Sequence, residues 1–360
     1  MGTSQAGLRV GIASGDWIHP NKTHDKVERW GGSGWARIGQ YIEYLPFDVV
    51  WGTLIWDTNR FVIADSEELL HDVDIVIMQR LMHAGIVQNI PDAQAYGQKV
   101  INDVDDWYWG LDPTNMAFSH NHPKNSPDEN INHYQSILSR SDVVMVSTPY
   151  LADRITRFVR GKIVLTTNTV DVARFTPRVH TDDLLPIVGW VGSTPHRSRD
   201  LETLQGILPP LVRSGEVTLH HSGDSPKAPS FASRIGIDPF LVTTKPLASH
   251  FDYPSLMVMD IGIVPLKDVP FNRAKSAIKG LEYAAAGVPF VAQDLDAYLD
   301  LATDGVGRIA KRPVNWLKHI RALYSADVRT EEAQRNRAIV QEKYDIKYGA
   351  ERLIDIISNI

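Results

Sequence analysis

Residues 261–294 constrain the fold of this chain more than any other stretch. They open with an apolar run at residues 261–266, which is typical of a buried parallel strand. Apolar residues at helical spacing follow and predict a helix with one face toward a core: Ala274, Ile278, Leu281 and Ala285. Gly287 suits a left-handed helix cap, Pro289 cannot continue a helix, and residues 290–292 begin another apolar run. The stretch therefore predicts a strand, a helix and a strand in succession.

The rest of the chain repeats this alternation. We predict further strands at residues 8–14, 48–54, 73–79, 99–103, 142–147, 162–166, 187–191, 217–222 and 240–243. We predict further helices at residues 35–45, 66–71, 91–98, 128–139, 150–158, 253–257, 316–324, 330–344 and 348–357, and one that starts at residue 201. This order favours parallel sheets with helices on both faces, and ligands then bind beyond the carboxyl ends of the strands.

Polar residues on the helix of the central stretch indicate an anion site. Lys275 and Ser276 fall in the predicted first turn, where backbone amides and the helix dipole favour negative charge. Lys275, Lys279 and Glu282 lie four and three residues apart on one stripe, and Glu282 can accept hydrogen bonds from two neighbouring hydroxyls. A diphosphate at the helix start and a ribose along its flank fit this spacing. The alternative is an ordinary surface helix, an interpretation that suits Lys279 best.

These residues resemble the donor-site signature of GT-B glycosyltransferases, in particular the large retaining family 4 group. Residues 282–292 match the second half of that signature, with its closing Gly-x-Pro-x-Val-Ala. The first glutamate of the signature would fall eight residues before Glu282, where this chain has Ala274. A family variant with Asn-x-x-Lys-Ser-x-x-Lys-x-x-Glu-Tyr fits better. It implies contacts to a nucleotide-sugar from Asn272, Lys275, Ser276 and Glu282.

The resemblance implies an α/β fold of the GT-B type, with two Rossmann-like domains facing each other across a cleft. Residues 168–177 resemble the linker between the domains of that family, and their turn residues and proline suit a boundary. We therefore expect an N-terminal acceptor domain at residues 1–172 and a C-terminal donor domain at residues 178–344. A last amphipathic helix, at about residues 345–360, is expected to cross back to the N-terminal domain.

Two glycine-bearing loops agree with this resemblance. Residues 31–34 read Gly-Gly-Ser-Gly after the first predicted strand, and the family carries a Gly-Gly there, so Gly32 is expected to face the donor. A flexible loop is the alternative. Gly192 opens the loop after the strand at residues 187–191, and the family uses an arginine of this loop for the donor diphosphate. Arg197 is our first candidate and Arg199 the second, since a guanidinium binds phosphate oxygens in a bidentate manner.

Two polar clusters in the N-terminal half have several interpretations. The family often places a histidine near the sugar; His120 is our candidate and His122 its rival, and a partial metal site or a surface loop is the alternative. Residues 103–109 read Asp-Val-Asp-Asp-Trp-Tyr-Trp at the end of a predicted strand. These carboxylates suit Mg²⁺ or Mn²⁺, an acceptor-site wall, or structural capping of loops. GT-B enzymes generally need no metal for their chemistry, so the resemblance implies no required cofactor and no metal site.

Composition narrows the classes of function. The chain has 360 residues, which is enough for two domains with sizeable cores. A net charge of -6 gives no support for nonspecific binding of nucleic acid, so we expect no nucleic-acid partner. No cysteine is present, which excludes disulfides and thiol chemistry and agrees with a cytoplasmic location. The N-terminal residues show no signal-peptide pattern, and no apolar run approaches the roughly 20 residues of a membrane span.

The sequence therefore predicts a glycosyltransferase that takes a sugar from a UDP- or GDP-sugar, with retention of configuration and without a metal. Lys275, Arg197 and His120 are the expected catalytic residues, the first two by stabilising charge on the leaving diphosphate. One alternative is a nucleotide-sugar-binding protein that has lost catalysis, since Ala274 replaces a glutamate. Another is a metal-dependent enzyme built on Asp103, Asp105 and Asp106. The acceptor, whether glycan, protein, lipid or small molecule, does not follow from the sequence.

Overall fold

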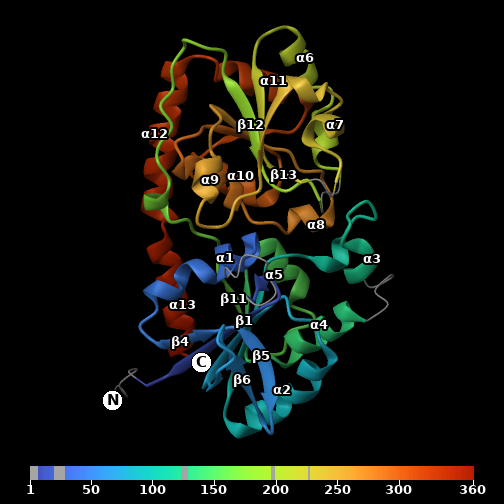
Figure 1. The fold of residues 1–360 in the computed structure, drawn as a ribbon, viewed down its shortest axis with the longest axis vertical. Coiled ribbons are helices and arrows are strands. Elements are labelled where there is room, and N and C mark those ends of the chain that lie inside the picture. Colours follow the sequence, from blue (N-terminus) through green and yellow to red (C-terminus); the bar gives the residue numbers. More distant parts are fainter. Residues whose placement is uncertain (1–6, 20–28, 123–128, 196–198, 226–227) are drawn as a thin grey trace. The chain divides into compact units, whose positions relative to one another are not determined.

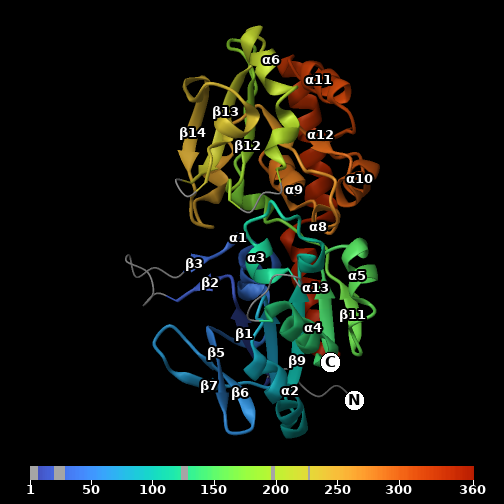
Figure 2. The ribbon, with the colours of Figure 1, turned by 90° about the vertical axis from the view of Figure 1, so that its right-hand side faces the viewer.

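The computed structural model describes residues 7–19, 29–122, 129–195, 199–225 and 228–360. The chain forms two compact units. Unit 1 comprises Met1–Trp109, His120–Asn168 and Ile346–Ile360, and unit 2 comprises Gly110–Ser119 and Thr169–Asp345. Each unit is built on a six-stranded parallel sheet with helices around it, as the alternation predicts (Figures 1 and 2). Within the described residues, no helix is both long and apolar enough to span a membrane.

The sheet of unit 1 has the strand order β11-β10-β9-β8-β1-β4, and every neighbouring pair is parallel. The strands are Arg9–Ser14 (β1), Asp48–Trp51 (β4), Ile75–Gln79 (β8), Lys99–Val104 (β9), Val143–Val146 (β10) and Lys162–Leu165 (β11). All six were expected from their apolar runs. The first strand in the sequence lies inside the sheet with its carboxyl end between two neighbours, the position at which ligands bind in such sheets.

Side chains that alternate along these strands form two separate cores. On one face, Ile12 and Ile77 pack with Leu353 of α13 (Ile346–Ser358), the last helix of the chain. On the other face, Val76 and Met78 pack with α2 (Ala84–Tyr96) and α4 (Asn130–Arg140). Unit 1 thus buries one face of its sheet with residues 346–360.

Unit 1 also contains an antiparallel sheet of three strands, which lies beside β1 (Figure 2). Its strands are Thr53–Asp57 (β5), Arg60–Ala64 (β6) and Leu70–Asp72 (β7). The helix expected at residues 66–71 is therefore wrong. The Asp65 carboxylate accepts hydrogen bonds from the backbone amides of Glu67 and Leu69, and this turns the chain back into β7. Such a local side-chain bond competes directly with helix formation.

The first helical region of unit 1 is also divided. Instead of one helix at residues 35–45, the structure has α1 (Gly32–Arg37) and the 3₁₀ helix η2 (Gly39–Tyr44), separated by Ile38. A Cβ atom at Gly39 would lie 3.0 Å from the Trp30 ring, so the chain approaches that ring closely where the two helices meet. The remaining elements of unit 1 are Trp17–Ile18 (β2), Arg29–Trp30 (β3) and Pro149–Ile155 (α5). Tyr108–Gly110 (η3) and Phe118–Asn121 (α3) each span a boundary between the units.

The sheet of unit 2 has the order β14-β13-β12-β15-β16-β17, again with parallel neighbours. Its strands are Ile187–Val191 (β12), Thr218–Asp224 (β13), Val242–Pro246 (β14), Ile261–Val264 (β15), Phe290–Gln293 (β16) and Arg308–Ala310 (β17). Numbered within the unit, this is the order 3-2-1-4-5-6 of a Rossmann fold. The chain reverses direction across the sheet between β12 and β15, so a ligand is expected beyond these two strands.

Helices cover both faces of this second sheet (Figure 1). One core joins the sheet to Ile278–Ala285 (α9), Asp296–Thr303 (α10) and Ala326–Lys343 (α12). The other joins it to Leu201–Leu204 (η5), Leu208–Arg213 (α6), Phe231–Ile235 (α7) and Pro313–Ala322 (α11). Shorter elements are Val172–Arg174 (η4), Pro239–Leu241 (η6), Tyr253–Leu256 (η7) and Pro270–Arg273 (α8).

The central stretch differs from the single helix expected after residue 270. It forms α8, an irregular turn at residues 274–277 and then α9. Lys275 and Ser276 therefore lie in the turn before α9 and not in its first turn. The end of α9 agrees with the expectation, since Gly287 has a φ of 64° and the Val288 amide donates to the Tyr283 carbonyl.

Candidate functional site in unit 2

Two glycines bring the backbone close together at the carboxyl ends of β12 and β13. Gly223 has a φ of 113°, and a Cβ atom there would lie 2.5 Å from the Gly192 carbonyl oxygen. The same oxygen lies 2.9 Å from Nε2 of His221, whose buried ring packs against those of Trp190 and Phe231. Gly192 therefore opens a loop whose first peptide is fixed in place.

Asp200 ties this loop to the central stretch. Its Oδ1 accepts hydrogen bonds from the Lys267 backbone amide at 2.9 Å and from Asn272 Nδ2 at 2.7 Å. Asn272 also donates to the Lys267 carbonyl at 2.9 Å. Asp200 and Asn272 are each only 2% exposed, so these bonds are shielded from water. Asn272, expected to contact a nucleotide-sugar, thus lies in a buried contact between two loops, and its Oδ1 has no hydrogen-bond partner among the described residues.

Lys267 also holds a segment from the N-terminal half of the sequence. Its Nζ lies 2.9 Å from Oδ2 of Asp112, which belongs to the part of unit 2 at Gly110–Ser119. Burial alone would raise the pKa of Asp112, but hydrogen bonds from Thr114 and Lys267 outweigh that effect and lower it. The loop after β15 is thus held by Asp200 at its backbone and by Asp112 at its side chain.

Glu282 lies on α9 within a group of three polar side chains. Its Oε2 is 2.8 Å from both Lys279 Nζ and the Tyr253 hydroxyl, and Lys279 also donates to that hydroxyl. Lys279, which we expected to point into solvent, is instead paired, with only 19% of its side chain exposed. In the described residues, Glu282 Oε1 accepts no hydrogen bond, so one carboxylate oxygen can still receive a ligand hydroxyl.

Lys275 and Ser276 are half-buried in the turn between α8 and α9. The Lys275 ammonium lies 4.4 Å from the centroid of the Phe271 ring, where the ring face attracts a cation. The Lys275 amide donates to the Asn272 carbonyl at 3.2 Å, so the turn continues directly from the residue that Asp200 holds. Unit 2 therefore places Gly192, Asp200, Asn272 and Lys275 in one connected set of loops.

Of the two arginine candidates in the Gly192 loop, the structure describes only Arg199. Arg197 lies outside the described residues. Arg199 is described, is exposed, and has a φ of 61°, an uncommon value for a residue with a side chain. Its backbone directly precedes the Asp200 contact.

In unit 1, the glycine loop surrounds a carboxylate. Asp16 Oδ2 accepts a hydrogen bond from the Gly34 amide at 2.9 Å, and a Cβ atom at Gly31 would lie 2.1 Å from the Asp16 Oδ1 atom. Gly31 is therefore required by this contact. A Cβ atom at Gly32, our candidate, would meet no described atom within 4 Å apart from those of its chain neighbours, so the start of α1 is open there.

The aspartates at the end of β9 form ion pairs with arginines. Arg37 and Asp103 form a buried pair with Nη2 to Oδ1 at 2.6 Å and side-chain exposures of 3% and 0%. Arg80 binds Asp105 at 2.9 Å and Asp106 at 2.6 Å. Burial alone would lower the pKa of Arg80, but these carboxylates outweigh it and raise the pKa. No group of three side chains suited to a metal ion occurs in the part of the chain that the structure describes.

The histidine candidates lie near α3. His120 belongs to α3 by its backbone, and its side chain is outside what the structure describes. His122 follows this helix and is half-buried.

Sequence reasoning missed Asp200, Tyr253 and Arg80. Asp200 carried a weak signal, as the last polar residue before the apolar start of η5, whereas the contacts of the other two depend on distant partners.

Comparisons with known proteins show the fold. No protein-family model and no curated protein matches the sequence. The structure is similar to sucrose-phosphate synthase from Thermosynechococcus elongatus, with a TM-score of 0.66 and 14% identity over 97% of this chain and 98% of that one. HepE from Anabaena, solved in complex with UDP-glucose, gives a TM-score of 0.66 and 12% identity over 98% of this chain and 100% of that one. A UDP-forming trehalose-phosphate synthase from Burkholderia xenovorans gives a TM-score of 0.54 and 11% identity over 82% and 75% of the two chains.

Proposed function

We propose that the protein is a glycosyltransferase that takes a sugar from a nucleotide-sugar, and that the donor is a UDP-sugar. The chain has the two-domain GT-B fold of the similar structures, which confirms the expected fold class. One of these, HepE, was solved with UDP-glucose, which supports the choice of base. The observation that carries the proposal is the contact of Asp200 with Lys267 and Asn272, because it joins the Gly192 loop to the Lys275 turn at the carboxyl end of the Rossmann sheet.

In this proposal the diphosphate and the ribose of the donor have named partners. Lys275 and Arg197 stabilise the negative charge that develops as the nucleoside diphosphate leaves. Oε1 of Glu282 accepts hydrogen bonds from the ribose hydroxyls, since its Oε2 already binds Lys279 and Tyr253. Ser276 and the Gly192 backbone complete the diphosphate site of unit 2, whereas Gly32 and His120 of unit 1 stay predictions from the family resemblance. Asn272 acts through the loops that it holds, because it is buried between them.

The proposal includes retention of configuration and independence of metal. The acceptor attacks on the face from which the diphosphate leaves, so no protein nucleophile is required, and the leaving phosphate takes the acceptor proton. Ala274, which replaces the first glutamate of the family signature, is fully buried, and its methyl side chain has no group to bind the sugar. This observation favours a second candidate function, a nucleotide-sugar-binding protein without catalysis. A metal-dependent enzyme is not proposed, because arginines bind Asp103, Asp105 and Asp106.

A thermal-shift panel tests the donor site. UDP-, GDP-, ADP- and dTDP-sugars are added to the wild type and to Lys275→Ala, each with and without EDTA. A donor at about 100 times its Kd stabilises the folded state by about 2.7 kcal/mol, which is about 5–10 °C for a unit of this size. Lys311→Ala is the matched control, since this lysine lies in the same unit with its side chain 78% exposed.

The expected result is a shift with a UDP-sugar that survives EDTA, is strongly reduced in Lys275→Ala and is unchanged in Lys311→Ala. If no nucleotide-sugar raised the melting temperature, the proposal would be refuted. Loss of the shift on addition of EDTA would contradict metal independence. Release of UDP, with or without an added alcohol, then separates a transferase from a protein that only binds the donor.

A further inference from the structure

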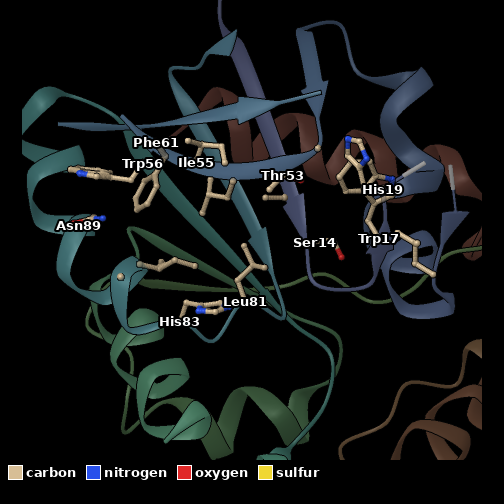
Figure 3. A pocket seen from close by; sticks show the side chains of 16 residues that line it. Ser14, Trp17, His19, Thr53, Ile55, Trp56, Phe61, Leu81, His83 and Asn89 are labelled. Carbon is tan, nitrogen blue, oxygen red and sulfur yellow. The ribbon is translucent and has the colours of Figure 1, made fainter. Parts of the chain in front are cut away.

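Unit 1 contains a pocket of about 610 Å³, lined by 16 residues (Figure 3). Its size is that of a site for a ligand with the dimensions of a drug molecule. The pocket begins at Ser14, at the carboxyl end of β1, and reaches Leu81, just after β8. It therefore lies at the edge of the parallel sheet where ligands bind in this fold class.

The walls of the pocket come from four separate parts of unit 1. Figure 3 shows Ile55, Trp56 and Phe61 of the β5–β6 hairpin along one wall, with Leu81 and His83 along the opposite wall. Asn89 of α2 lies at the end of the pocket near Trp56, and Trp17 lies at the other end. The antiparallel sheet that interrupts the alternation of strands and helices thus supplies one side of a binding cavity.

The lining is apolar and uncharged. None of its 16 residues, all within the described part of the chain, is an aspartate, glutamate, lysine or arginine. Trp17, Trp56 and Phe61 offer aromatic surface, and Ile18 and Ile55 remain 47% and 37% exposed. A ligand that covers this apolar surface gains about 25 cal/mol for each Å² removed from water. A phosphate or carboxylate in the same place would lose its hydration without meeting an opposite charge.

The polar groups of the lining are few. Ser14 Oγ already donates to Gln79 and accepts from the Asp16 amide, and His19 Nε2 contacts the Asp65 carbonyl. The side chains of Thr53, His83 and Asn89 form no hydrogen bond with other described residues. Three available side chains can satisfy one or two hydroxyls, whereas an oligosaccharide would leave many of its hydroxyls without partners.

We infer that this pocket binds the acceptor of the proposed transfer, and that the acceptor is an uncharged small molecule in which a hydrophobic ring system carries a hydroxyl. This inference rests on the proposed function for the transfer itself. In that step the acceptor oxygen bonds to the anomeric carbon of the donor sugar, and the bond from that carbon to the phosphate oxygen breaks. The electron pair stays on the leaving diphosphate, and the acceptor proton passes to the phosphate oxygen.

The test combines equilibrium binding with turnover, with 2-naphthol as the probe and maltose as its polar counterpart. Binding of each is measured by titration calorimetry without a donor. Ile55→Asp puts a carboxylate into the pocket, and the fold tolerates it because Ile55 is partly exposed. Leu70→Asp is the matched control, since Leu70 lies on the same antiparallel sheet, is 61% exposed and does not line the pocket.

We expect 2-naphthol to bind, maltose not to bind, and Ile55→Asp to weaken 2-naphthol binding by about tenfold or more while Leu70→Asp leaves it unchanged. With a UDP-sugar present, the wild type should form naphthyl glycoside. In Ile55→Asp the rate of this reaction should fall in parallel with 2-naphthol binding. The inference is overturned if 2-naphthol does not bind, if maltose binds in its place, or if Ile55→Asp alters neither binding nor transfer. Failure of donor binding with intact 2-naphthol binding would instead count against the proposed transferase, so the two failures are distinguishable.

Discussion

Replacement of Asp200 tests whether the two loops of the donor site depend on one carboxylate. Within the described residues its carboxylate accepts two hydrogen bonds, from the Lys267 amide and the Asn272 side chain, and both reach the same oxygen, Oδ1. Although Asp200 directly precedes η5, its side chain does not cap that helix. Asp200→Ala therefore removes both bonds, while Asp200→Asn keeps an acceptor oxygen in the same place.

The size of the effect follows from these two bonds. A hydrogen bond to a charged group contributes about 1.5–3 kcal/mol, so loss of both in Asp200→Ala is expected to reduce the free energy of unfolding by about 3–6 kcal/mol. Neutral hydrogen bonds contribute about 1 kcal/mol each, so Asp200→Asn should lose about half as much. Water cannot easily replace the carboxylate, because Asp200 and Asn272 are each 2% exposed.

Urea unfolding measures the global change, and hydrogen exchange locates it. Exchange of the Lys267 amide should accelerate strongly in Asp200→Ala and much less in Asp200→Asn, because this amide is the donor to the missing oxygen. Donor binding, followed by the thermal shift with a UDP-sugar, should fall in the same order. Equal stability of the two variants, or unchanged protection of the Lys267 amide, would refute the claim that this carboxylate joins the loops.

Three further predictions concern other parts of the molecule. Asp103→Ala leaves the buried Arg37 charge without its ion-pair partner and should lower the free energy of unfolding in urea by about 3–5 kcal/mol. If EDTA lowered the stability of the wild type by the same amount, Asp103 would be a metal ligand instead. Gly223→Ala should reduce the thermal shift with a UDP-sugar and lower the free energy of unfolding by about 1–3 kcal/mol, because its Cβ would lie 2.5 Å from the Gly192 oxygen at a φ of 113°. Gly215→Ala is the control that separates the clash from backbone strain, since Gly215 also has a positive φ but lies in open space. Burial alone would raise the pKa of Asp260, but the neighbouring His180 and hydrogen bonds from the Ile187 amide and Arg178 outweigh it and lower the pKa to about 2. The resulting stability is present above the ordinary pKa of 3.8 and is lost as the pH falls toward 2, so acid unfolding of Asp260→Asn should lack this component.

Several inner strands of the parallel sheets could be predicted because they are short apolar runs buried on both faces. β1, β8 and β15 show this pattern, and a pattern of that kind depends on nearby residues only. The cap at Gly287 was predictable for the same reason, since a glycine followed by a proline ends a helix locally. The helix at residues 66–71 was wrong because the Asp65 side chain captures two backbone amides there, a contact that competes with an otherwise acceptable helix.

The contacts of the candidate site were less predictable because their partners are far apart in the sequence. Asp200 and Asn272 are separated by 72 residues, and Glu282 and Tyr253 by 29. A metal was one of three interpretations of the Asp103 cluster, because the sequence shows the carboxylates but not their partners, whereas the structure shows that Arg37 and Arg80 bind them. The break between α8 and α9 also had no local signal, since the alanines of that turn favour a helix.

The return of residues 346–360 to unit 1 has a consequence for synthesis of the chain on the ribosome. Leu353 and Ile356 of α13 complete the core that contains Val10 and Ile12. Those strands emerge first, yet the helix that covers them is translated after every residue of unit 2. Unit 1 therefore cannot complete this core until residues 346–360 have been translated, so its early strands do not give it the usual lead in folding. A nascent chain paused at about residue 345 would present the uncovered apolar face of unit 1 to chaperones.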